Sequence, residues 1–249
     1  MSSLASTTDT NHPSSSHPPL PSSNSAYSRL DYWNERFTSE KQFEWLLNYS
    51  DLKSYISHAC TRAGLNKTIT SVLLVGCGNS TLSPDMYSDG YQNVISLDYS
   101  TSCIESMKLQ FPETDNFKWV LGDMTNLVDF KAAQFDLVID KAAMDAIMVE
   151  EGDVWNPDTN VIDMARKMCR EISRVLRVGG MHLQVSFAQP HFRRKYLEGG
   201  HGGEGGVDSS GVYNEFGWDL TDEPVAGDNK DGCFHHFFYS MHKKRDGKW

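Results

Sequence analysis

A short apolar run that stops at Gly-x-Gly constrains the fold of this chain most strongly. Residues 71–80 are Ser-Val-Leu-Leu-Val-Gly-Cys-Gly-Asn-Ser, and a second apolar run over residues 94–97 ends at Asp98. Glycines after one strand let the backbone approach a ligand, and an acid after the next strand can accept both ribose hydroxyls. The pair predicts a nucleotide-type cofactor site in a parallel α/β sheet. A dinucleotide fingerprint would need a third small residue where this chain has Thr81.

Strand-like and helix-like segments alternate along the chain. Strands are expected near 71–75, 93–98, 117–121, 135–140, 180–187, 212–219 and 233–241, and helices near 41–48, 51–63, 101–110 and 161–177, with a shorter one after Pro84. Ser100 is a suitable cap for the helix at 101–110, and Gly179-Gly180 is expected to stop the long helix. This alternation predicts a doubly wound, mostly parallel sheet with helices on both faces. The last two strands have no helix between them, so we expect a seven-stranded sheet with an antiparallel C-terminal hairpin.

The composition excludes several classes of protein. The chain has 249 residues, 23 Lys plus Arg and 33 Asp plus Glu, which gives a formal charge of −10. That balance argues against a protein that binds nucleic acid through its phosphates. The apolar runs are strand-sized and no secretory signal is visible, so we expect no membrane association. The five cysteines are scattered and show neither a disulfide framework nor metal spacing, which indicates a cytoplasmic or nuclear protein.

The length suits one large α/β domain. Residues 1–26 are mostly Ser, Thr, Pro, Asn and His, and they predict a disordered tail before a single domain at 27–249. A Gly-rich segment near 198–211 predicts a flexible loop, and residues 224–231 predict a turn-rich connection. His235 and His236 are neighbours in an expected strand and point to opposite faces, so we expect no metal site there.

Further motifs make the resemblance to a known family specific. They stand in this order: Asp31-Tyr-Trp-Asn-Glu-Arg-Phe37, Phe43-Glu-Trp-Leu46, Leu74-Val-Gly-Cys-Gly-Asn-Ser80, Leu97-Asp-Tyr-Ser100, Gly122-Asp-Met124, Phe135-Asp-Leu-Val-Ile-Asp-Lys141, Met144-Asp-Ala146, Val178-Gly-Gly180, Pro190-His-Phe-Arg193 and Tyr239-Ser-Met-His-Lys243. The chain resembles the class I, seven-β-strand S-adenosylmethionine-dependent methyltransferases, which have a Rossmann-like fold. Within them it is similar to the eukaryotic elongation factor 1-alpha lysine methyltransferase 4 group, which also resembles the N-terminal region of some endothelin-converting enzyme 2 forms.

The resemblance implies S-adenosyl-L-methionine as the cofactor and assigns residues to it. Gly76 and Gly78 leave room for the amino-acid end of the cofactor, although glycines also serve plain turns. Asp98 accepts the ribose hydroxyls and Tyr99 flanks the adenine or ribose; the alternative for Asp98 is a helix cap. After the third strand, Asp123 accepts from the adenine amino group and the backbone N–H of Met124 donates to the ring. A surface turn is the alternative there.

Aromatic residues before the first strand cover the cofactor in the resembled group. Here they are Trp33, Phe37 and Trp45, and a sulfonium cation is attracted to ring faces. Packing of an N-terminal helix on the core is the alternative. In the family the lysine that matches Lys141 borders the cofactor.

The acceptor site is expected at the carboxyl ends of the fourth and fifth strands. Asp140 is the candidate for contacting the incoming nucleophile, and Asp145 is its helper or a helix-surface carboxylate. His191, after the fifth strand, is a second catalytic candidate, with a structural histidine as the alternative. We expect no metal.

The resemblance implies a protein-lysine N-methyltransferase that acts on elongation factor 1-alpha or a similar protein, and we expect it to be a monomer. Two alternatives remain open at this point. One is a small-molecule methyltransferase on the same fold. The other is a cofactor-binding scaffold without turnover of its own.

Overall fold

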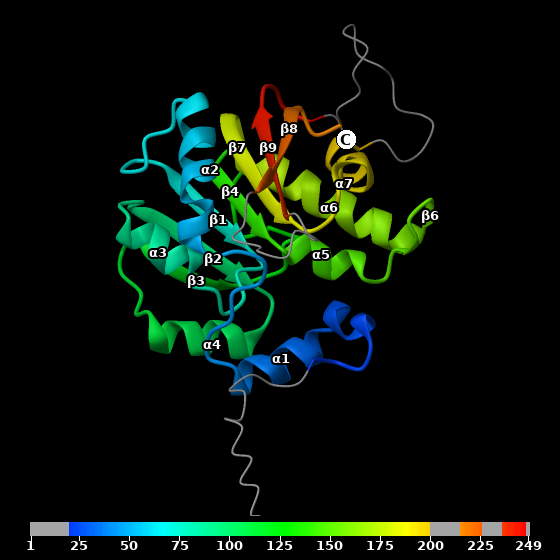
Figure 1. Cartoon of the computed structure of the whole chain (residues 1–249). Coiled ribbons are helices and arrows are strands. Elements are labelled where there is room, and N and C mark those ends of the chain that lie inside the picture. Colours follow the sequence, from blue (N-terminus) through cyan, green and yellow to red (C-terminus); the bar gives the residue numbers. More distant parts are fainter. Residues whose placement is uncertain (1–19, 200–214, 226–235, 248–249) are drawn as a thin grey trace, which may run out of the picture.

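The computed structural model describes residues 20–199, 215–225 and 236–247. These residues form a seven-stranded sheet with helices on both faces, in the strand order β3-β2-β1-β4-β7-β9-β8 (Figure 1). The strands are β1 (Ser71–Val75), β2 (Asn93–Asp98), β3 (Phe117–Leu121), β4 (Phe135–Lys141), β7 (Leu176–Ser186), β8 (Trp218–Val225) and β9 (His236–Lys243). The first five are parallel and β9 pairs antiparallel with both β7 and β8, so the expected fold class is confirmed.

Helices precede the first strand and join most of the later ones. They are a 3₁₀ helix, η1 (Asn24–Ser28), and α1 (Leu30–Ser39), α2 (Tyr49–Arg62), α3 (Leu82–Ser88), α4 (Thr101–Gln110), α5 (Ala143–Met148), α6 (Thr159–Val175) and α7 (Pro190–Glu198). A two-stranded ribbon, β5 (Gly152–Asp153) with β6 (Asn156–Pro157), lies between α5 and α6. No helix in the described part of the chain is long and apolar enough to cross a bilayer.

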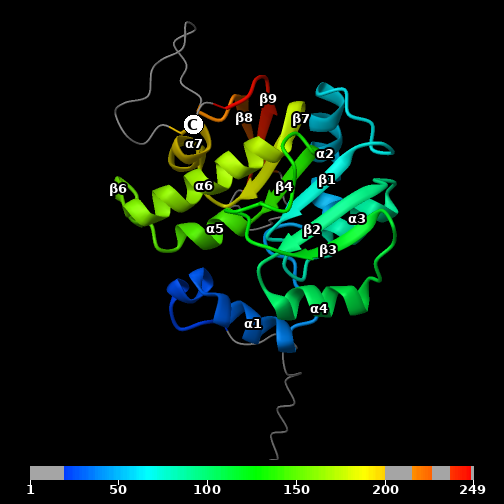
Figure 2. The same cartoon turned by 180° about the vertical axis from the view of Figure 1, so that it is seen from behind.

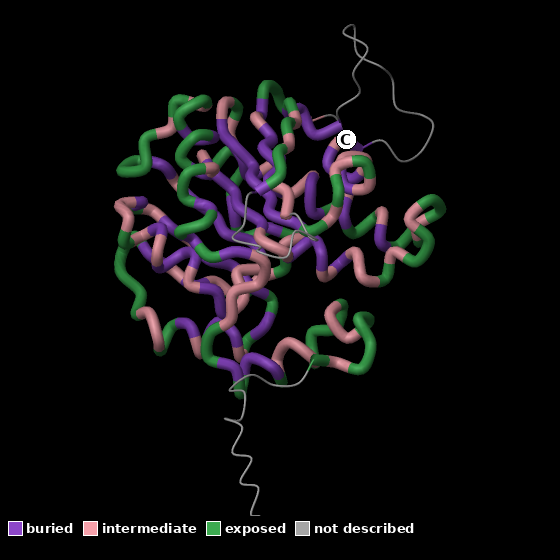
Figure 3. The backbone as a smooth tube through the Cα atoms, in the orientation of Figure 1, coloured by how far each residue is buried: buried purple, intermediate pink, exposed green. Residues whose placement is uncertain are grey.

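The sheet is buried between two helical layers. On one face α2, α3 and α4 pack against alternate strand residues such as Val72 and Leu74, and on the other face α5, α6 and α7 pack against Leu73 and Val75. Figure 2 shows the second layer from behind. The central strands are buried along most of their length in Figure 3. Strands that are apolar on both sides are expected when helices cover both faces of a parallel sheet.

The helix at 101–110 was predicted with its cap: Ser100 Oγ accepts from the N–H of Cys103 at 3.2 Å. One helix prediction was wrong. Residues 41–48 are not helical: Asn48 is the N-cap of α2, and the helices that precede the sheet are α1 and α2. The long helix predicted at 161–177 is present as α6, but it ends at Val175, so Gly179 and Gly180 do not stop it; they lie inside β7, whose register against β4 is irregular.

The C-terminal hairpin is displaced from its predicted position. Its first strand, β8, extends to Val225 and includes Pro224, which the sequence placed in a connection. Proline is tolerated there because β8 is an edge strand. The predicted tail at 1–26 was wrong for Asn24–Ala26, which belong to η1, while residues 1–19 lie outside the described residues. The predicted Gly-rich loop also lies outside them, apart from Glu198 at the end of α7 and its C-cap Gly199.

Candidate active site

A cavity of about 820 Å³ lies at the carboxyl edge of the parallel strands. Every cofactor residue predicted from the sequence borders it, namely Trp33, Phe37, Trp45, Gly76, Gly78, Asp98, Tyr99, Asp123, Met124 and Lys141. We call the part formed by Gly76, Gly78, Asp98, Tyr99, Asp123 and Met124 the cofactor half. The part formed by Asp145, Glu150, Asp158, Val161, Met164 and Phe187 is the acceptor half.

The glycine turn of the cofactor half is fixed by packing and by Asp98. Gly76 has a φ of +58°, and a Cβ at this position would overlap the Cβ of Ala143 at the start of α5. Gly78 has a φ of +52°, and its N–H donates to Asp98 Oδ2 at 2.9 Å. The turn therefore needs glycine both for its left-handed backbone and for its approach to α5.

Asp98 joins the two turns that follow β1 and β2. Its Oδ1 accepts from the N–H of Ser100 at 2.9 Å, while Oδ2 takes the Gly78 N–H. The side chain is 4% exposed and borders the cavity, and burial raises the pKa of its carboxyl to about 6. Each carboxylate oxygen has more than one acceptor site, so both remain able to accept a ribose hydroxyl. This donor and acceptor set fits the ribose of S-adenosylmethionine.

Tyr99 and Asp123 are the exposed edge of this half. Tyr99 is 37% exposed beside the cavity. Asp123 Oδ1 accepts from the N–H and hydroxyl of Thr125, at 2.7 and 2.8 Å, so it does shape a surface turn. This surface turn therefore also forms part of the cavity wall. The adenine contact of Asp123 stays a prediction.

A cluster of aromatic rings from η1, α1 and the segment before α2 covers the cavity. Trp33 stacks on Phe37 with ring centroids 5.4 Å apart and meets Trp45 edge-on at 5.9 Å. The indole N–H of Trp33 donates to the carbonyl of Tyr27 at 2.7 Å, and Tyr27 also borders the cavity. Tyr27 was not predicted, because a lone tyrosine beside a polar segment carries no recognisable signal.

The aromatic cluster forms a lid over the cavity, and a buried ion pair between Arg36 and Glu40 connects this lid to the glycine turn. Both groups are at least 96% buried and their contact is bidentate, at 2.8 and 2.9 Å. The side-chain amide of Asn79 in the turn donates to the Glu40 carbonyl at 3.0 Å. The lid and the glycine turn are therefore one connected structure.

Lys141 borders the cavity at the end of β4, where its ammonium group is already paired. Its Nζ donates to Glu44 Oε2 at 2.9 Å and to the Trp45 carbonyl at 2.8 Å. Burial lowers the pKa of Lys141, and the Glu44 carboxylate opposes that shift. Glu44 also accepts from the N–H of Thr81 at 2.5 Å and from the hydroxyl of Ser80 at 2.7 Å. The sequence gave no sign of these contacts, so the role of Glu44 was missed.

The two catalytic candidates from the sequence do not border the cavity. Asp140 has no exposed surface: its Oδ1 accepts from the N–H of Ala143 at 2.8 Å, and its Oδ2 accepts from Gln184 at 2.6 Å. The structure corrects the expected contact between Asp140 and the acceptor. The Asp140 carboxylate is buried, and its hydrogen bonds hold the turn that leads into α5. His191 is exposed on α7 with its ring 3.8 Å from that of Phe192. The structure does not bring His191 to the site.

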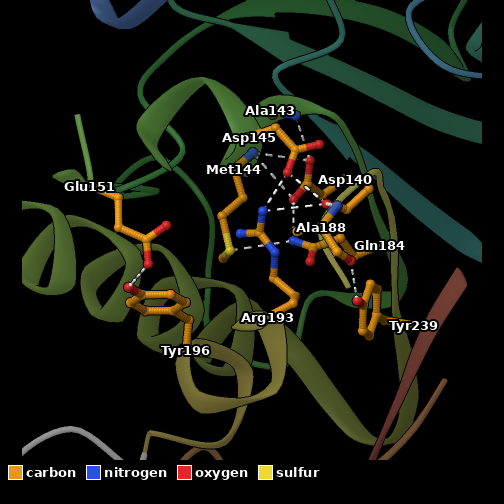
Figure 4. Close-up of polar contacts among 11 residues, drawn as sticks. Asp140, Ala143, Met144, Asp145, Glu151, Gln184, Ala188, Arg193, Tyr196 and Tyr239 are labelled. Carbon is orange, nitrogen blue, oxygen red and sulfur yellow. Dashed lines mark hydrogen bonds and ion pairs between the residues drawn. The ribbon is translucent and has the colours of Figure 1, made fainter. Parts of the chain in front are cut away.

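Asp145 is a buried carboxylate that borders the acceptor half. It is 5% exposed, and its Oδ1 accepts from Ser186 at 2.6 Å and from the guanidinium of Arg193. Figure 4 shows Asp140, Asp145 and Arg193 gathered close together. The sequence left Asp145 between a helper and a surface carboxylate, and burial excludes the second alternative.

Three possible metal ligands also meet at the cofactor half. The ligand atoms of Cys77, Asp98 and Cys103 lie within 4.8 Å of one another. The cysteines are far apart in the sequence, so their spacing could not reveal the cluster. Burial raises the pKa of the Cys77 thiol, and the hydrogen bond with Cys103 only partly opposes this shift, so the thiol stays protonated. The described residues supply three ligands, whereas a structural Zn²⁺ site takes four.

Comparison with known proteins defines the class. Residues 73–183 match the family model of a methyltransferase domain. The fold is that of solved methyltransferases: magnesium protoporphyrin IX methyltransferase from Synechocystis PCC 6803 superposes with a TM-score of 0.55 at 12% identity, over 91% of this chain and all of that one. Geranyl diphosphate C-methyltransferase from Streptomyces coelicolor gives a TM-score of 0.54 at 11% identity, over 90% of this chain. The chain belongs to the S-adenosylmethionine-dependent methyltransferases.

The similar curated proteins are more specific. EEF1A lysine methyltransferase 4 of Mus musculus is 28% identical over 234 residues, which cover 92% of this chain and 81% of that protein. The eEF1A lysine and N-terminal methyltransferase of Homo sapiens is 32% identical over 179 residues, which cover 71% of this chain and 24% of the longer human protein. The sequence resemblance to this group is confirmed.

Proposed function

We propose that this methyltransferase transfers a methyl group to a lysine side chain of translation elongation factor 1-alpha. The observation that carries the proposal is the similarity, over 92% of the chain, to a protein named for that activity. The acidic surface implied by a formal charge of −10 is complementary to a basic protein segment. We propose that the enzyme acts as a monomer, and that it works in the cytoplasm, as its scattered cysteines indicate.

The cavity accounts for the two things that methyl transfer needs from a protein, which are alignment of the nucleophile and exclusion of water. When bound, S-adenosylmethionine supplies the methyl group: the lysine nitrogen bonds to the methyl carbon as the sulfur–carbon bond breaks, the electron pair stays on sulfur, and the product ammonium loses a proton to solvent. Asp98 would hold the ribose, and Trp33, Phe37 and Trp45 would cover the cofactor. The acceptor half is the remaining side from which a lysine can enter.

The test is incubation of the purified protein with tritiated S-adenosylmethionine and bacterially produced elongation factor 1-alpha, followed by mass spectrometry of the labelled product. A methylated lysine in the factor supports the proposal, and a substitution of that lysine by arginine should abolish the label. A parallel incubation with cytosolic extract covers the alternatives. Label only in small molecules would indicate a small-molecule methyltransferase, and no label anywhere would indicate a scaffold.

A further inference from the structure

Asp145 has an acceptor oxygen that no side chain in the described structure uses. Its Oδ1 accepts from both Ser186 and Arg193, whereas Oδ2 is buried and makes no hydrogen bond of ordinary geometry; the backbone N–H of Phe187 is the other donor that acts on this carboxyl. A buried carboxylate oxygen without a donor is costly, and such atoms are rare in folded proteins. Because Asp145 borders the cavity, a ligand in the acceptor half can supply the missing donor.

The charges around Asp145 favour a cationic donor. Asp140 and Asp145 are buried carboxyls, and Arg193, whose side chain is 2% exposed, is paired with Asp145 and also acts electrostatically on Asp140. The three side chains lie close together in Figure 4, and when both carboxyls are ionised they carry one negative charge in excess of the Arg193 cation. Burial raises the pKa of the Asp145 carboxyl, while Arg193 opposes that shift. An ammonium group at Oδ2 would balance the cluster.

The rest of the acceptor half suits an alkyl chain that ends in an amine. Val161 is buried in its wall, and Met164 and Phe187 are 43% and 60% exposed beside it. The exposed carboxylates of Glu150 and Asp158 also border it. Apolar walls with acids at the exposed end and one buried acid at the inner end match the stem and head of a lysine.

Asp145 also occupies the right place in the sheet. The cofactor half follows β1 and β2, and Asp145 follows β4, the neighbour of β1 on its other side. Gly76 packs directly against Ala143, two residues before Asp145. The amino-acid end of the cofactor, which carries the reactive methyl, is expected at that turn.

We infer that Asp145 binds the amine of the methyl acceptor through Oδ2, and that the acceptor half selects primary amines on an alkyl stem. Oδ2 can accept a hydrogen bond from the amine in its charged or neutral form, so the contact orients the nitrogen before and during attack. This inference deepens the proposed function and takes from it only that the acceptor is an amine.

The test uses two cofactor analogues in which nitrogen replaces sulfur, one with an amine-terminated alkyl chain in place of the methyl group and one with a plain alkyl chain. Their affinities for the full-length protein are measured by calorimetry. The wild type should prefer the amine analogue by roughly tenfold or more, the value of a charge-assisted hydrogen bond. Asp145→Asn should lose this preference, because it keeps an oxygen for Ser186 and Arg193 but not the charge. Affinity for S-adenosylhomocysteine should stay within roughly threefold.

Asp163→Asn is the matched control, since Asp163 is exposed on α6 and does not border the cavity. It should keep the preference for the amine. A preference that survives in Asp145→Asn, or is absent from the wild type, overturns the inference. A crystal structure of the wild type with the amine analogue needs no variant: the amine nitrogen must lie within about 3.2 Å of Oδ2, and any other position overturns the inference.

These results are separable from the fate of the proposed function. If elongation factor 1-alpha is not labelled but Asp145 sets the amine preference, the acceptor is another amine and the inference stands. If the factor is labelled and the preference does not depend on Asp145, the proposed function stands and the inference fails.

Discussion

The two halves of the cavity are built in different ways. In the cofactor half, Asp98 is held by backbone N–H groups from residues close to the strand ends, and both of its oxygens are used. In the acceptor half, Asp145 is held by side chains from β7 and α7, and one of its oxygens is left without a donor. Local backbone contacts fix a site for a ligand that does not vary, whereas a long-range side-chain cluster can hold an unpaired group for the acceptor.

Substitution of Gly76 should have the largest effect. Gly76 belongs to the cofactor half and packs against Ala143 in α5, the helix that carries Asp145 of the acceptor half. Gly76→Ala introduces a side chain at positive φ that overlaps Ala143, so we expect a loss of at least about 2 kcal/mol in the free energy of unfolding and loss of cofactor binding. Gly64→Ala is the control: its φ is +67° but nothing lies within 4 Å of the new Cβ. Urea unfolding measures both. Equal losses would show that backbone strain, not packing on α5, makes Gly76 necessary.

Asp98→Ala should come next. Loss of a charged group that accepts from the ribose hydroxyls costs on the order of 1.5–3 kcal/mol, or roughly 10- to 150-fold in affinity for S-adenosylhomocysteine. Asp123→Ala should have a smaller effect, because Asp123 is exposed. Calorimetric titration of both folded variants tests the order. If Asp123→Ala loses more affinity than Asp98→Ala, the adenine contact dominates the cofactor half.

The pH dependence distinguishes two buried acids, Asp98 in the cofactor half and Asp140 behind the cavity wall. Burial raises the pKa of both Asp98 and Asp140 to about 6, and for Asp140 the nearby Asp145 adds to this effect. Only Asp98 borders the cavity. As the pH falls from 7 to 5, affinity for S-adenosylhomocysteine should fall by on the order of tenfold, because Asp98 gains a proton. Asp98→Asn should flatten this profile and Asp140→Asn should not.

The same pKa values determine the direction in which the free energy of unfolding changes with pH. Each folded pKa lies above the ordinary aspartate value of 3.8, so the folded state holds the proton more tightly than the unfolded chain. The resulting stability is present below about pH 4 and is lost as the pH rises through about 6. Between pH 4.5 and pH 7, Asp140→Asn should therefore gain on the order of 1–2 kcal/mol relative to the wild type, measured by urea unfolding at each pH. A constant difference would show that Asp140 is not protonated in the folded protein.

The sequence predicted the cofactor half better than the acceptor half, for a physical reason. Gly76, Gly78 and Asp98 lie within a few residues of the strand ends, so strand order alone places them at one edge. Asp145 meets Arg193 across 48 positions of the chain, through α7, which the sequence did not predict. The same limit applied to Glu44: its partner Lys141 is 97 positions away, and no local pattern connects them.

A substitution in the aromatic lid should have the smallest effect. It tests whether the lid contacts the bound cofactor. Trp33 stacks on Phe37 and borders the cavity, so Trp33→Ala should weaken S-adenosylmethionine binding about two- to fivefold, as expected for an exposed cation–π contact. Binding of S-adenosylhomocysteine, which has no sulfonium charge, should change less. Trp155→Ala is the control, since Trp155 is 81% exposed, packs on Phe192 and does not border the cavity. Equal losses for both ligands would mean that Trp33 covers the adenosine or the protein core rather than the sulfonium.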